Sequence, residues 1–254
     1  MTLVLTEVSA LGIAMASDTA VTTINLATGL AYAQPNRARK LQVVTHLAAG
    51  VSCWGLGEIS GLPTDRWLSR FIENASHVSD VHEFAHRLAD QLNIQVGENP
   101  AADNRLGFHV AGFVDQNGDR LPAFYHVHDG PSTTLASRGI QVNPHKFNPN
   151  QDIPPDVSAN AAAQGVSLII RNGDYQLYAA MFQKLEEFFS ALRPLGVMIP
   201  NSQDVGDRAQ YLVFQIRTIA SLYRLSNLIP GIGGGILHLA ITREGIHSKG
   251  THFM

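Results

Sequence analysis

The sequence predicts an α+β protein with the four layers of an αββα sandwich. Three observations on the 254-residue chain lead to this prediction. Short apolar β-type runs come in pairs, segments with helical periodicity come in pairs, and the two kinds of pair alternate along the chain. The order is strand pairs, two helices, strand pairs, two helices and a last strand. This is the order expected when two sheets are stacked between two layers of helices.

The first strand pair occupies the N-terminus. Residues 2–8 alternate loosely between apolar and polar types, residues 9–12 offer a turn, and residues 13–16 form a second apolar run that ends near Asp18. Two short runs joined at a glycine-containing turn predict a hairpin. Strands rise about 3.3 Å per residue, so a return strand of similar length brings Asp18 back to the neighbourhood of Thr2.

Thr2 follows the initiator methionine directly, and this position gives it a chemical possibility. Removal of Met1 would leave Thr2 with both a nucleophilic hydroxyl and a free α-amine. A threonine hydroxyl is a weak nucleophile until a base takes its proton, and an N-terminal threonine carries that base itself. The ordinary pKa of an α-amine is about 7.7–8.0, so part of it is neutral near pH 7. Asp18 would orient the ammonium, and Lys40 would favour an alkoxide-like hydroxyl.

Several elements of the first fifth of the chain follow a shared pattern. They are Thr2, the turn glycine Gly12, the run 13–18, the cluster 39–41 and the strand-like segment 46–52. Together they resemble the opening of a proteasome β-type subunit, within the N-terminal-nucleophile (Ntn) hydrolases. The resemblance implies an Ntn-type sandwich and a threonine peptidase or amidase that needs no metal or other cofactor. It implies Thr2 as nucleophile, Asp18 and Lys40 as the tuning pair, and a backbone N–H of Cys53 or Trp54 as oxyanion donor.

The chain also departs from the family pattern. The stretch between Asp18 and Lys40 is longer than usual in the family and predicts an extended loop. No counterpart is found for the second aspartate and the two serines that buttress the threonine, and residues 233–235 match only the glycine-rich part of that region. An inactive Ntn-fold scaffold or binding protein is therefore an alternative. An Ntn acylase for small amides shares the chemistry and differs only in the shape of its pocket.

A different motif predicts a different chemistry. The segment His82-Glu83-x-x-His86 satisfies the H-E-x-x-H pattern of zinc peptidases, and it lies on a predicted helix as that pattern requires. The longer zinc-binding form is broken by Ala89 and Leu92, and no third ligand follows at a suitable distance. A solvated helix face is the other interpretation of these three residues.

The remaining segments complete the predicted order of elements. Residues 138–164 are rich in Pro, Asn and Ala and lack periodicity, which predicts a long loop or insertion within a single domain spanning residues 1–254. Helices are expected from about residue 62, from residue 79, and over 174–192 and 205–226; strands are expected over 107–114, 123–128 and 235–242.

Composition limits the kinds of partner and the cellular compartment expected for this chain. The net charge is −3 without a basic stripe, which argues against a nucleic-acid partner. No run of about 18 apolar residues or signal-peptide pattern is found, which argues against a membrane segment and against secretion. Cys53 is the only cysteine, which fits a reducing compartment, so we expect a cytoplasmic protein. The expected partners are a peptide or amide substrate and, by resemblance, further copies in a ring or helical stack; the sequence names no ATPase partner.

Overall fold

The computed structural model describes residues 2–24, 31–34, 38–96, 106–116, 118–129, 146–153, 157, 160–161, 164–174, 176–198, 200, 202–226 and 231–253. Within these ranges two five-stranded antiparallel sheets dominate the molecule. The first sheet has the order β12 (Leu168–Gly173), β1 (Leu3–Ser9), β2 (Gly12–Asp18), β13 (Ile236–Thr242) and β14 (Gly245–His252). The second has the order β11 (Asn148–Ile153), β10 (Asp119–His128), β9 (Leu106–Gln116), β6 (Ala49–Gly55) and β5 (Leu41–Val44).

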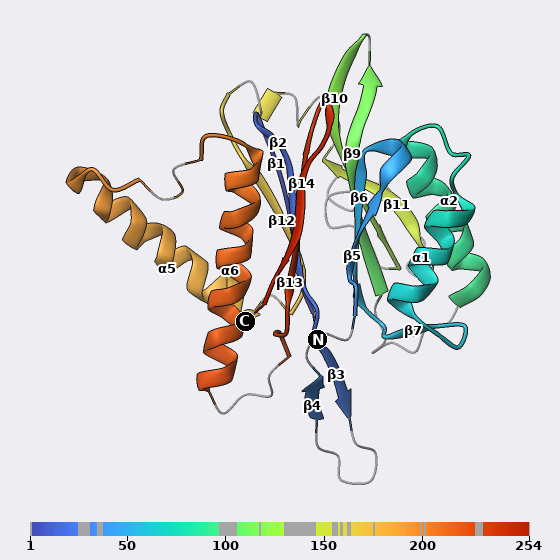
Figure 1. Cartoon of the computed structure of the whole chain (residues 1–254), viewed down its shortest axis with the longest axis horizontal. Coiled ribbons are helices and arrows are strands. Elements are labelled where there is room, and N and C mark those ends of the chain that lie inside the picture. Colours follow the sequence, from blue (N-terminus) through green and yellow to red (C-terminus); the bar gives the residue numbers. More distant parts are fainter. Residues whose placement is uncertain are drawn as a thin grey trace.

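Helices and two short hairpins complete the described elements. The helices are α1 (Thr64–Asn74), α2 (Val81–Val96), α5 (Gln176–Leu192), α6 (Val205–Leu225) and the 3-10 turns η1 (Thr45–Leu47) and η2 (Arg193–Leu195). The hairpins are β3 (Val21–Ile24) with β4 (Ala31–Gln34), and β7 (Glu58–Ile59) with β8 (Leu62–Pro63). In Figure 1 the two sheets face each other, with α1 and α2 outside the second sheet and α5 and α6 outside the first.

Three apolar clusters hold these elements together. One lies between the sheets and includes Met15, Phe124 and Ile241. The second joins α1 and α2 to the second sheet through residues such as Phe84 and Phe108, and the third joins α5 and α6 to the first sheet. Full burial of one such large apolar side chain stabilises the fold by about 1.5–3 kcal/mol. Both faces of the central strands are covered, which explains why β1 and β2 are buried along their whole length.

The N-terminal hairpin has the pairing that the sequence predicts. Val4 lies opposite Ser17 in the antiparallel register, which brings the end of β2 back beside the start of β1. Gly12 begins β2 with a φ of +130°, and a Cβ atom there would lie 2.3 Å from the Ile241 carbonyl oxygen. Only glycine fits at this turn, because any side chain would both strain the backbone and collide with β13.

The expectation of a mixed fold is confirmed, and so are the four expected helices. Several strands were not expected as such, among them β12 and the strands of three peripheral segments. The segment 138–164 contains β11, which pairs with β10 although it includes Pro149. An edge strand needs hydrogen bonds on one side only, so proline is tolerated there. Residues 138–145 of the expected loop lie outside the described residues.

The other two peripheral segments with unexpected strands are polar as well. The expected loop between Asp18 and Lys40 contains the β3–β4 hairpin, which projects beyond the two sheets in Figure 1. The last expected strand ends at residue 242, yet β14 follows and pairs along β13. Both segments lack the apolar alternation that reveals a half-buried strand. Among the described helices, none has the length and apolar character needed to cross a membrane.

Candidate active site

The centre of the site is the carboxylate of Asp18, at the end of β2 and fully buried. Its Oδ1 accepts the Leu3 backbone N–H and the Lys40 ammonium, both at 3.0 Å. Its Oδ2 accepts the backbone N–H groups of Ala20 at 3.2 Å and Gly233 at 3.3 Å. A buried carboxylate is stable when its acceptor positions are filled, and this one has four donors.

Lys40 is buried beside Asp18 and owes its position to the second sheet. The residue directly precedes β5, and its carbonyl accepts the Cys53 backbone N–H of β6 at 2.9 Å. Its ammonium also donates to the carbonyl of Ala20, so both partners of the cation lie at the end of β2 or just after it. Two sheets thus meet at one ion pair, and the charge of Lys40 is held in place beside a pocket that the residue lines.

Thr2 lies just before β1 and is buried, with 6% of its surface exposed. It lines a pocket of about 300 Å³ together with Lys40, Cys53 and Trp54. The rest of the wall comes from residues 20–22, Gln34, Ala38, residues 55–57 and residues 63–65. The structure therefore brings four of the five predicted site residues to one pocket, with Asp18 behind Lys40.

The two backbone groups expected as oxyanion donors both lie on β6. The Cys53 N–H donates to the Lys40 carbonyl, which leaves Trp54, opposite Gly107 of β9, as the remaining expected donor. The Trp54 indole lies over Gly107, where a Cβ atom would approach the ring to 2.5 Å. Burial raises the pKa of the Cys53 thiol to about 12, although the Lys40 charge opposes this shift. The thiol is therefore protonated at neutral pH and is a poor nucleophile.

The sequence does not indicate Asp174, which lies beside Thr2, or Tyr223, which contacts Asp174. The Asp174 backbone N–H, just after β12, donates to the Thr2 carbonyl at 2.7 Å. Tyr223 of α6 donates its hydroxyl to Oδ2 of the same aspartate. Sequence reasoning placed Asp174 only as a helix start. The signal that could have found it is the Gly173-Asp174 pair between a β-type run and a helix.

The glycine-rich segment 233–235 packs its backbone against the end of β2. The Thr19 N–H donates to the Gly235 carbonyl at 2.9 Å, and the Ala20 N–H donates to the Gly233 carbonyl at 3.0 Å. These bonds, with the Gly233 N–H on Asp18, fix the backbone around the buried carboxylate. The segment therefore supports the site through main-chain contacts.

The zinc-peptidase motif has a structural role in this fold. Glu83 accepts the Ser79 backbone N–H at 3.2 Å and forms an ion pair with Arg87 at 2.8 Å at the start of α2. These contacts, the Ser79 bond first, lower the pKa of Glu83 and keep it ionised as part of a helix cap. The ring centroids of His82 and His86 lie 4.4 Å apart on the exposed face, with the rings tilted by 58°. Within the described ranges no third His, Cys, Asp or Glu completes a metal-binding group with them.

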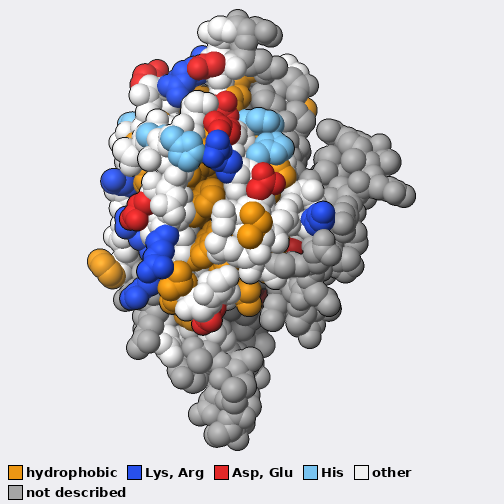
Figure 2. Space-filling view, turned by 90° about the vertical axis from the view of Figure 1, so that its right-hand side faces the viewer, with side chains coloured by type: hydrophobic (Ala, Val, Ile, Leu, Met, Phe, Trp, Pro, Cys, Tyr) orange, Lys and Arg blue, Asp and Glu red, His pale blue; other side chains and the backbone are white. Residues whose placement is uncertain are grey.

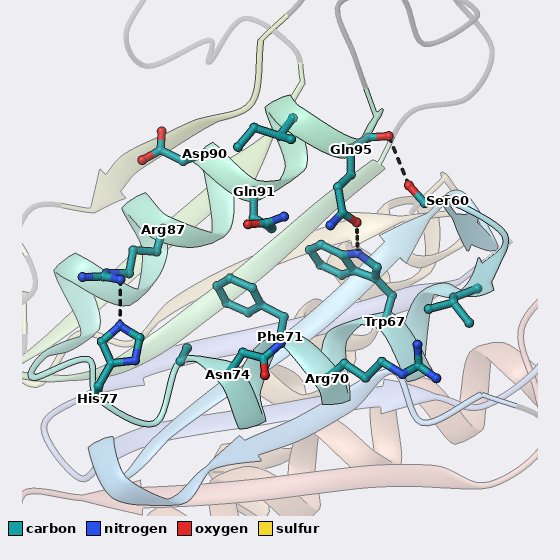
Figure 3. Close-up of a pocket in the computed structure, with 13 residues that line it drawn as sticks. Ser60, Trp67, Arg70, Phe71, Asn74, His77, Arg87, Asp90, Gln91 and Gln95 are labelled. Carbon is teal, nitrogen blue, oxygen red and sulfur yellow. Dashed lines mark hydrogen bonds between the residues drawn. The ribbon is translucent and has the colours of Figure 1, made fainter.

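A larger hollow, of about 870 Å³, lies between α1 and α2 on the outer face of the molecule. Figure 3 shows Trp67 and Phe71 of α1 facing Gln91 and Gln95 of α2, with a hydrogen bond from Trp67 to Gln95. In Figure 2 hydrophobic side chains form a band down this face, with charged side chains around it. None of the predicted site residues lines this hollow.

No family model matches the chain, and no curated protein matches it. Among solved structures, the fold is similar to that of an Anbu (Gly-1) mutant from Hyphomicrobium sp. strain MC1. The TM-score is 0.53 and the sequence identity is 12%, over 100% of this chain and 87% of that chain. At this identity the likeness concerns the fold alone. Anbu is a proteasome-like protein, so this chain has a distantly proteasome-like fold.

Proposed function

We propose that this protein is a proteasome-like Ntn hydrolase, a threonine peptidase or amidase whose nucleophile is Thr2 after removal of Met1. The observation that carries the proposal is the position of Thr2 in a pocket beside the buried Lys40–Asp18 ion pair. The distantly proteasome-like fold supports it independently of the local motif. The proposal includes the Ntn type of the layered fold, a cytoplasmic location and assembly with further copies of the chain.

The reaction begins with a proton transfer within Thr2. The neutral α-amine takes the hydroxyl proton as Oγ attacks the carbonyl carbon of the substrate, and the carbonyl π electrons move to its oxygen. The Trp54 backbone N–H donates to that oxyanion, and the Lys40 ammonium stabilises the negative charge that develops on Oγ. Asp18 keeps Lys40 in place and compensates its buried charge.

The second half of the reaction restores the enzyme. The α-ammonium gives its proton to the leaving nitrogen as the C–N bond breaks, which leaves the acyl group on Thr2 Oγ. The amine then takes a proton from water, the resulting hydroxide attacks the ester, and the proton returns to Oγ as the acid product leaves. All protons balance within Thr2, water and substrate, and no metal is required.

Intact-mass spectrometry before and after treatment with a peptide epoxyketone tests the proposal. We expect the purified protein to lack Met1 and to gain a single adduct, because this class of inhibitor reacts with an N-terminal threonine. Thr2→Ala should lose Met1 in the same way and form no adduct, whereas Thr2→Ser should still react. A protein that lacks Met1 and still forms no adduct would overturn the proposal in favour of an inactive Ntn-fold scaffold.

A further inference from the structure

The buried Asp18 has too few acceptor positions to bind both the Lys40 ammonium and the Thr2 amine, as the sequence suggests. From the sequence alone it is the expected partner of the Thr2 ammonium as well as of Lys40. An ionised carboxylate offers about four acceptor positions. In the structure four donors face them: the Lys40 ammonium and the backbone N–H groups of Leu3, Gly233 and Ala20, the last shared with the Gly233 carbonyl. The amine that catalysis requires at Thr2 therefore needs another partner.

Asp174 is a second acidic residue that the fold holds beside the Thr2 backbone, through its own N–H. Strand β12 pairs with β1 so that Gly173 lies opposite Leu3, and the Asp174 N–H then donates to the Thr2 carbonyl at 2.7 Å. Gly173 makes the approach possible: its φ is +92°, and a Cβ atom there would lie 1.9 Å from the Thr2 oxygen. The two backbones are therefore locked together beside the atom that becomes the amine.

The side chain of Asp174 is itself held from a third element. Tyr223 of α6 donates its hydroxyl to Oδ2, and no other hydrogen bond to this carboxylate is seen in the described part of the chain. Burial, and then the hydrogen bond with Asp174, raise the pKa of Tyr223. The phenol thus stays protonated across the working pH range and keeps donating. One carboxylate oxygen is fixed by this bond, and Oδ1 is left for a further donor.

We propose that Asp174, fixed by Tyr223, is the positioning residue that receives an N–H of the Thr2 amine and aims its lone pair at Oγ. The inference rests on the proposed function and assigns the partner of its general base. The two carboxylates then have separate partners: Asp18 pairs with the Lys40 ammonium, and Asp174 accepts a hydrogen bond from the Thr2 amine. The negative charge of Asp174 also stabilises the ammonium that forms when Oγ gives up its proton.

The experiment compares the rate of epoxyketone modification across pH 5–9 in processed wild type, Asp174→Asn, Tyr223→Phe and Tyr178→Phe. The general base must be neutral to act, so the rate rises with pH through the pKa of the amine. A neighbouring carboxylate raises that pKa. Asp174→Asn is therefore expected to slow modification at the plateau by about 10²-fold and to shift the acidic limb by about one pH unit toward lower pH.

The two tyrosine variants separate positioning from charge. Tyr223→Phe keeps the Asp174 carboxylate but removes the hydrogen bond that fixes it, so we expect a smaller rate loss, of roughly tenfold. The pH at which the rate rises should stay within a few tenths of a unit of the wild-type value. Tyr178→Phe is the matched control, because Tyr178 donates its buried hydroxyl to Gln215 at 3.0 Å, away from Thr2. It should leave both rate and limb unchanged. Asp174→Ser provides a second neutral variant if the asparagine chain folds poorly.

The outcomes distinguish the role of Asp174 from the proposed hydrolase function. Wild-type rates and an unshifted limb in both Asp174 variants, with Thr2→Ala unreactive, would overturn the role of Asp174 and leave the proposed function intact. An equal rate loss in Tyr178→Phe and Tyr223→Phe would also overturn it, because the effect would then reflect packing. A wild-type protein that lacks Met1 and does not react would overturn both proposals together.

Discussion

Two buried carboxylates of the first sheet form ion pairs with residues outside that sheet, and the two pairs are built differently. Asp18 pairs with Lys40 at 3.0 Å and Glu7 pairs with Arg208 at 2.6 Å, and both carboxylates are fully buried. Asp18 has four donors from four places in the chain. Glu7 receives both of its contacts on Oε1 from Arg208, and Oε2 has no partner within the described ranges.

The surroundings of the two pairs differ as much as their hydrogen bonds. The Lys40 ammonium sits in the wall of the pocket that also holds Thr2. Arg208 instead joins α6 to the middle of β1, and its guanidinium lies over the ring of Tyr211 at 5.4 Å. A buried ion pair alone therefore does not indicate chemistry. What indicates it is a charge fixed by a filled hydrogen-bond network and placed beside a nucleophile.

The largest effect is expected from Lys40→Met. The change removes the cation beside Thr2 and leaves Asp18 buried without its ion-pair partner, which costs about 3–5 kcal/mol of unfolding free energy. We expect the rate of epoxyketone modification to fall by about 10³-fold per folded molecule. Urea unfolding and intact-mass kinetics on the same preparation separate the two losses. Asp18→Asn combined with Lys40→Met should restore stability without activity; recovery of activity would contradict the role of Lys40.

Arg208→Met breaks the other ion pair and should give a purely structural defect. The expected loss of unfolding free energy is again about 3–5 kcal/mol, since Glu7 stays buried without its cation. The modification rate of the folded fraction should remain within about twofold of wild type, because the partners of Arg208 seen in the described part of the chain, Glu7, Ser202 and Tyr211, do not line the Thr2 pocket. A rate loss in Arg208→Met as large as that in Lys40→Met would contradict the view that only the Lys40–Asp18 pair acts in catalysis. Glu7→Gln in the Arg208→Met background is expected to recover part of the stability.

The smallest effect concerns Cys53, whose thiol pKa is raised by burial more than the Lys40 charge lowers it. Its thiol pKa is raised from 9.0 to about 12. The stability linked to this proton is complete below about pH 9 and is lost as the pH rises toward 12, because the unfolded thiol ionises first. Iodoacetamide at pH 8 should therefore alkylate the native protein about 10³-fold more slowly than the urea-unfolded protein. Fast labelling of native protein would show that Lys40 activates the thiol.

The sequence reveals the parts of the site that form through short-range pairing. The hairpin that returns Asp18 to Thr2 joins neighbouring strands, so its apolar runs and its turn glycine are enough to predict it. Lys40 and Trp54 follow because they flank the next strand pair. The zinc motif shows the limit of local patterns: Glu83 is a helix cap, and only the surroundings of α2 distinguish a cap from a metal site.

The contacts that the sequence does not reveal join distant parts of the chain. Asp174 reaches Thr2 through the register of β12 on β1, and no local pattern encodes that register. Tyr223 reaches Asp174 from α6, where it looks like one more aromatic residue of an apolar helix face. Polar edge strands such as β14 lack the alternation that would announce them, because their neighbours cover them on one side only.

The hydrogen bond from Gly233 to Asp18 has a consequence for the order of events in the cell. Residue 233 lies 215 positions after Asp18, yet its backbone N–H completes the hydrogen bonds of that buried carboxylate. A nascent chain still lacking this segment carries Thr2 without a finished site around it. In the proposed enzyme, hydrolytic capacity would then arise only after residue 233 has been synthesised, and a shorter polypeptide would not be exposed to its own activity.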